Sequence, residues 1–112
     1  MKQSPLSARQ AAALRARFER CRQGLLALDW LTEGSVSENH PGSWRWTRKV
    51  KAKTVTVALS APQAEAFRQA IANQRRLEEL IKEMRALSQS FLLQSIPGPA
   101  RRPSTKTIQK RA

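Results

Sequence analysis

The strongest structural signal in the sequence is a long helical period that runs from Ser60 to about Leu93. Ser60 is a favourable N-cap, and Pro62 follows in the first turn, where its missing N–H is not needed. Apolar side chains then recur at steps of four and three, with a second row along one flank. The two rows are Ala66, Ala70, Leu77, Leu80, Met84, Leu87 and Phe91, and Phe67, Ile71 and Ile81. Such a helix is roughly 50 Å long, so part of its stripe must meet another helix.

A second amphipathic helix is predicted to begin at the N-cap Ser7. Its apolar seam consists of Ala11, Leu14, Phe18, Cys21, Leu25 and Leu28. Because Cys21 lies on this seam, we interpret it as a small buried hydrophobe rather than a reactive thiol. The outer faces carry five arginines against Glu19 alone, which indicates either a solvated face or one that meets phosphates. Trp30 and Leu31 are expected to join the core from the end of this helix.

Residues 29–43 are predicted to form a connecting loop, because Gly34, Pro41 and Gly42 lie there among small polar residues. His40 is expected to be a lone exposed imidazole. No second histidine, cysteine pair or positioned carboxylate accompanies it to suggest a metal or catalytic role.

Residues 44–60 alternate in the manner of a two-stranded antiparallel hairpin. With Lys51 and Ala52 as the loop, the pairs are Val50 with Lys53, Arg48 with Val55, Trp46 with Val57 and Trp44 with Leu59. One surface then holds these eight residues, and the other holds Arg45, Thr47, Lys49, Thr54 and Thr56. Lys-Ala is unfavourable in a tight loop, so a longer loop is the alternative. We expect the tryptophan surface to pack on the helix that follows, although both indoles could instead form a stacking platform for bases.

The charge of the chain favours a polyanionic partner. The 112 residues include 21 Lys and Arg against 8 Asp and Glu, a formal net charge of +13. Residues 39–64 and everything after Met84 contain no acid, so these regions are expected to meet a phosphate backbone. The predicted nucleic-acid contacts are Arg15, Arg17, Arg22, Arg45, Arg48, Lys49, Lys51, Lys53, Arg75, Arg76, Arg101 and Arg102.

The sequence predicts an α+β fold that is mostly α: a helix, a two-stranded antiparallel hairpin, a long helix and a basic tail. We expect residues 1–6 to be disordered, residues 7–93 to form a single domain, and residues 94–112 to form a disordered tail, because its prolines prevent a helix. Such a basic tail binds nucleic acid through counterion release.

Catalysis is not indicated. The four glycines are scattered rather than clustered in a phosphate-binding loop, and most carboxylates lie at pairing distance from Lys or Arg. We therefore predict a protein that is not an enzyme and uses no metal or other cofactor. A single cysteine and the lack of a secretory or membrane segment predict a cytoplasmic location, without a membrane partner.

The far end of the long helix is predicted to remain uncovered by the first helix and the hairpin. Its interaction seam is Leu77, Leu80, Met84, Leu87 and Phe91. We expect this seam to mediate self-association, as in a homodimer, or pairing with a partner's helix. Asn73 either fixes the register of a helix pair or turns toward the polar surface.

Residues 46–80, WTRKVKAKTVTVALSAPQAEAFRQAIANQRRLEEL, resemble a family of small bacterial proteins of unknown function that are often encoded beside transposase genes. The family's signature is a basic aromatic strand followed by a KTVT return strand, here residues 46–56. Many members carry a cysteine-rich stretch ahead of the hairpin, which is absent from residues 31–43. The resemblance implies an accessory protein of a mobile element, with a transposase or another mobile-element protein as a partner.

The leading hypothesis is a nonenzymatic nucleic-acid-binding accessory protein that holds DNA or structured RNA mainly through phosphate contacts. The alternative is a coiled-coil interaction module that docks on an acidic partner, such as a transposase or a regulator.

Overall fold

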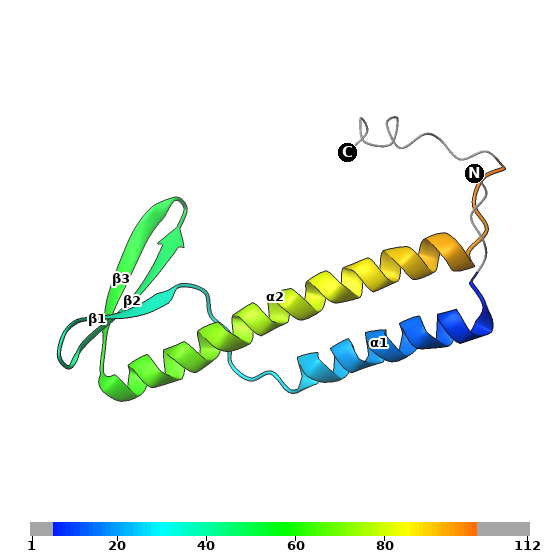
Figure 1. Cartoon of the computed structure of the whole chain (residues 1–112). Coiled ribbons are helices and arrows are strands. Elements are labelled where there is room, and N and C mark those ends of the chain that lie inside the picture. The colour runs from blue at the N-terminus through cyan, green and yellow to red at the C-terminus, as the bar shows by residue number, and fades with distance from the viewer. Residues whose placement is uncertain (1–5, 101–112) are drawn as a thin grey trace.

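Two helices and a three-stranded sheet make up the fold, and residues 6–100 of this computed structural model are described (Figure 1). The elements in chain order are α1 (Ala8–Leu26), β1 (Ser35–His40), β2 (Ser43–Val50), β3 (Lys53–Leu59) and α2 (Ala61–Ser95). The predicted α+β, mostly helical class is therefore confirmed, but the sheet has a third strand. The terminal stretches 1–5 and 101–112, which hold most of both predicted disordered ends, lie outside the described residues.

Both helices begin where the sequence predicts. Ser7 and Ser60 each accept a hydrogen bond from the backbone N–H three residues on, and Gln10 and Gln63 bond back to the cap N–H, so each start is a complete capping box. At 35 residues, α2 is about 52 Å long and spans most of the 64 Å length of the molecule. It ends at Ser95, so the first two residues of the predicted tail are helical.

α1 lies alongside the C-terminal part of α2 and covers the stripe there (Figure 1). Cys21, Leu80 and Leu87 are buried at the centre of this helix pair. The half-buried side chains around them are Leu14, Phe18, Leu25, Leu28 and Met84. The expectation that the far end of the stripe is uncovered is thus wrong, because the sheet covers the start of α2 and leaves the rest to α1. Gly24 allows this close packing, since a Cβ there would lie only 3.0 Å from Leu80 Cδ1.

The three strands form an antiparallel sheet in the order β1-β2-β3, which corrects the predicted loop over residues 29–43. β1 runs from Ser35, opposite Thr47, to His40, opposite Ser43, with an irregularity near its end. The strand satisfies the backbone groups along the edge of β2 that β3 leaves free, which explains why residues of low strand propensity adopt it. Gly34, at φ +106°, precedes it, and a Cβ there would lie 2.5 Å from the Thr47 carbonyl oxygen.

Beyond Leu28, which packs on the helix pair, the segment between α1 and β1 crosses α2 through polar contacts. Asn73 donates a hydrogen bond to the Trp30 carbonyl, and the Thr32 N–H donates to the Ala70 carbonyl. Asn73 therefore joins this segment to α2, which neither sequence interpretation anticipated. Trp30 is 82% exposed and Leu31 is also exposed, so their predicted core role is wrong. α1 ends at Leu26, before either residue could lie on its apolar face.

Candidate nucleic-acid interface

The β2–β3 hairpin has the predicted register. Trp44 pairs with Leu59, Trp46 with Val57, Arg48 with Val55 and Val50 with Lys53. Lys51 and Ala52 form the two-residue loop at φ 49° and 67°, the left-handed values that a type I′ turn requires. The unfavourable Lys-Ala pair is therefore accommodated in the tight loop rather than avoided by a longer one.

The base of the hairpin is fixed to the start of α2 by its two tryptophans. The Trp46 ring lies 4.7 Å from the Phe67 ring, and the Arg68 guanidinium lies 4.4 Å above the Trp44 ring. The Trp46 indole N–H also donates to the Glu33 carbonyl. Both indoles are half-buried, so their packing role is confirmed, and the base-stacking platform stays a prediction.

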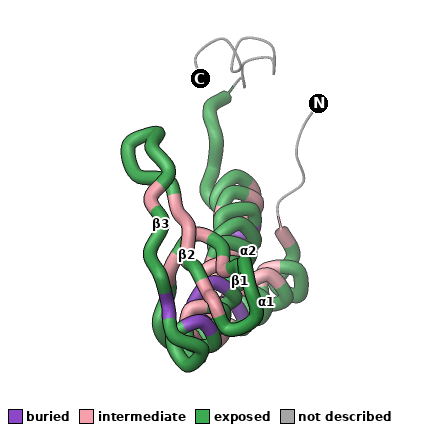
Figure 2. Tube along the Cα trace, turned by 90° about the vertical axis from the view of Figure 1, so that its left-hand side faces the viewer, coloured by how far each residue is buried: buried purple, intermediate pink, exposed green. Residues whose placement is uncertain are grey.

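Beyond this base the hairpin stands clear of the helices, and Figure 2 shows its tip exposed. Every residue from Lys49 to Thr54 is exposed. The last pair that β1 makes with β2 is Ser35 with Thr47, so the hairpin is only two strands wide from Arg48 onward. The tip is therefore a narrow ribbon with both faces and both edges open.

Five cations lie on this hairpin, and its register keeps them apart. They are Arg45, Arg48, Lys49, Lys51 and Lys53. Each of the four within the strands faces a neutral partner: Arg45 faces Ala58, Arg48 faces Val55, Lys49 faces Thr54 and Lys53 faces Val50. Like charges placed directly opposite would destabilise a hairpin, so this arrangement holds a dense positive charge at limited cost. Among residues 6–100, no carboxylate forms an ion pair with any of the five.

The predicted contacts on the helices differ from those on the hairpin, because carboxylates pair with most of them. Arg15 and Arg22 both pair with Glu19, Arg17 pairs with Glu83 across the helix pair, and Arg76 pairs with Glu79. These partners reduce the local positive potential. Arg75 is exposed on α2, and Arg101 and Arg102 lie outside the described residues. The structure thus gathers the five hairpin residues in one region and does not bring the helical arginines to it.

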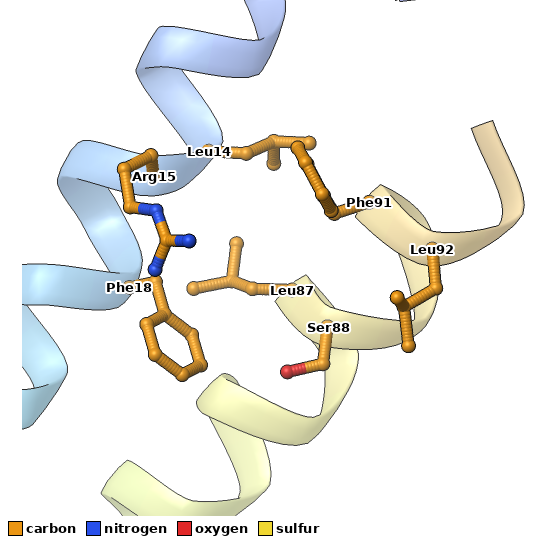
Figure 3. Close-up of a pocket in the computed structure, with 7 residues that line it drawn as sticks. All are labelled: Leu14, Arg15, Phe18, Leu87, Ser88, Phe91 and Leu92. Atoms are coloured by element: carbon orange, nitrogen blue, oxygen red, sulfur yellow. The ribbon is translucent and has the colours of Figure 1, made fainter. Parts of the chain in front are cut away.

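The interaction seam is mostly occupied within the chain. Leu80 and Leu87 are buried, and Leu77, Met84 and Phe91 are half-buried. A cavity of about 220 Å³ opens at the far end of the helix pair (Figure 3). Its lining is Leu14, Arg15, Phe18, Leu87, Ser88, Phe91 and Leu92. This cavity is a gap in the helix interface, remote from the hairpin, with a single charged side chain at its rim.

The remaining candidates for chemistry are isolated. Cys21 is buried as predicted, and burial together with the Glu83 carboxylate raises the pKa of its thiol, which keeps it protonated. His40 is exposed, as expected. Within the described part of the chain, no three His, Cys, Asp or Glu side chains gather as a metal site would require.

Comparison of the chain with protein-family models, with curated proteins and with solved structures finds no match. Over residues 6–100, no helix combines the length and the apolar character needed to cross a membrane.

Proposed function

We propose that this protein is a nonenzymatic nucleic-acid-binding protein that holds DNA or structured RNA mainly through phosphate contacts of the β2–β3 hairpin. The observation that carries the proposal is the charge of this hairpin, which bears five cations and has no acidic residue between Ser43 and Leu59. Four of the five, Arg48, Lys49, Lys51 and Lys53, lie on the two-stranded ribbon that stands clear of the helices. Concentrated positive charge without internal partners favours a polyanion, because phosphates release condensed counterions when they are neutralised.

The helix pair serves this function as a stem. It buries the apolar side chains of α1 and α2 against each other, while the start of α2 holds the base of the sheet. Ion pairs partly neutralise the arginines of the helices, whereas among residues 6–100 none involves a cation of the hairpin.

The test is the salt dependence of binding to a labelled DNA duplex and to an RNA stem-loop, measured by fluorescence anisotropy. Five phosphate contacts give a slope of log affinity against log salt of about −4.5, which is a loss of roughly five hundredfold between 50 and 200 mM salt. Replacing Arg45, Lys49 and Lys51 together by alanine should reduce the magnitude of that slope by about 2.7. A slope that does not change in the triple variant would refute the proposal.

The matched control replaces three exposed cations of the helices, Arg20, Lys82 and Arg85, by alanine. The charge change is the same, so a general effect of net charge predicts equal losses for the two triple variants. A hairpin interface predicts a small loss for the control. Circular dichroism should be native for both variants, because all six side chains are exposed.

The accessory role in a mobile element, with a transposase as a protein partner, follows from the resemblance of residues 46–80. Its test is co-purification of the protein with a transposase encoded beside its gene. The coiled-coil alternative has little uncovered seam to use, since α1 occupies the stripe of α2.

A further inference from the structure

We infer that the β2–β3 hairpin enters the major groove of duplex DNA with its tip first. This inference rests on the proposed function and specifies its ligand. The starting observation is that the cations lie on both faces of the ribbon: Lys49 on one, and Arg48 and Lys53 on the other. Arg45 shares the face of Lys49 but lies in the three-stranded base. A sheet that lies flat on a phosphate surface uses cations on one face only. A ribbon inserted between two phosphate backbones uses both.

The free length of the ribbon matches the depth of the groove. From Thr47, the last residue paired with β1, three residues lead to the turn, a projection of about 10 Å. The major groove of B-form DNA is about 8.5 Å deep, so the tip reaches its floor while the three-stranded base stays outside. Gly34 marks where the three-stranded part of the sheet ends, because β1 pairs with β2 only from the next residue, Ser35, onward.

The width of the ribbon discriminates between grooves. A single β-layer with side chains on both faces is about 10 Å thick, which suits a major groove about 12 Å wide and exceeds a minor groove of about 6 Å. The major groove of A-form RNA is deep and too narrow for side chains to read. Duplex DNA is therefore the ligand that fits the shape.

The tip offers side chains that suit base edges. Lys51 in the turn is a donor for the guanine O6 and N7 atoms, and Val50 beside it is 40% exposed and suits a thymine methyl group. Behind them, Arg48 lies 4.2 Å above the Trp46 ring, which holds this guanidinium at the level where the ribbon meets the groove wall.

Methylation interference tests which groove is occupied. A random-sequence duplex is partially methylated with dimethyl sulfate, which modifies guanine N7 in the major groove and adenine N3 in the minor groove. DNA bound by the full chain is then separated from free DNA. Bound DNA should be depleted of 7-methylguanine relative to free DNA, with unchanged 3-methyladenine. Depletion of 3-methyladenine alone, or of neither base, would overturn the inference.

Lys51→Ala should abolish most of the 7-methylguanine depletion, whereas Lys82→Ala, the same change on the exposed surface of α2, should retain it. Equal depletion by the two variants would contradict a tip in the groove. An RNA duplex of random sequence and equal length should bind about tenfold more weakly than the DNA duplex at the same salt, and equal affinities would also reject the inference. In each of these failures nucleic acid still binds, so the proposed function survives; no binding to any nucleic acid would refute both.

Discussion

Thr54→Glu is expected to stabilise the hairpin and to weaken nucleic-acid binding. Thr54 is exposed and lies directly opposite Lys49, so a carboxylate there forms a cross-strand ion pair. The control is Thr54→Gln, which has nearly the same size and strand propensity without the charge. Relative to that control, the free energy of unfolding should rise by about 0.2–1 kcal/mol at low salt.

The loss of binding has a calculable size. If the new carboxylate neutralises Lys49, one phosphate contact is lost, and the slope of log affinity against log salt falls in magnitude by about 0.9. The loss of this one phosphate contact lowers the affinity roughly tenfold at 0.1 M salt, or by about 1.4 kcal/mol. Stability and affinity therefore change in opposite directions, as expected where charge serves a ligand rather than the fold.

Urea denaturation followed by circular dichroism gives the stability difference, and anisotropy titrations at several salt concentrations give the affinity and the slope. Equal affinities of the glutamate and glutamine variants would refute the assignment of the interface to this face. A glutamate variant less stable than the glutamine variant would show that a carboxylate at position 54 gains nothing from Lys49 across the strands.

Three further outcomes are expected. Gly24→Ala should lower the free energy of unfolding by up to about 2 kcal/mol, because crowding against Leu80 outweighs the gain in helix propensity. In a Leu80→Val background the same change should raise it by up to about 1 kcal/mol, and denaturant midpoints measure both effects. Ala52→Gly should raise the free energy of unfolding by about 0.5 kcal/mol or more, since alanine at φ 67° is strained and glycine is not. Burial raises the pKa of Cys21 above its usual 9.0, so the unfolded chain loses the thiol proton first as the pH rises, and the stability of the fold falls above pH 9. Urea titrations at neutral and alkaline pH should show that Cys21→Ala removes this part of the fall.

Local signals predicted most of the elements because they are decided within a few residues. The caps Ser7 and Ser60 each needed only a glutamine three residues on. The hairpin register followed from alternation, because a slip of one residue would turn Trp46 away from α2. Ion pairs such as Arg15 with Glu19 were also accessible from the sequence, since they lie four residues apart on one helix.

Which apolar face of a helix or of the sheet packs against which other face was not predictable from local signals. Two amphipathic helices and an apolar sheet face can be combined in several ways, and the choice of α1 for the far end of α2 depends on contacts distant in sequence. β1 was missed because strand propensity in residues 35–40 is low and the free edge of β2 supplies its partners. The available signal was the pair Pro41 and Gly42, with Gly42 at φ +82°, which is typical of a tight turn between strands.

The attachment of the hairpin to the helix pair would also limit the entropy lost in the proposed binding of nucleic acid. β3 ends at Leu59 and α2 begins at Ala61, so Ser60 alone connects them, and its capping box with Gln63 fixes both sides of the junction. Leu59 is buried there, and the contact between Trp46 and Phe67 holds the base of the sheet at a second point. A ribbon held at two points loses little orientational freedom when it meets a ligand, so more of its electrostatic free energy remains as affinity. The same geometry suits the proposed insertion into a groove, because β1 and β3 stiffen the base of β2 and leave only the tip as a two-stranded ribbon.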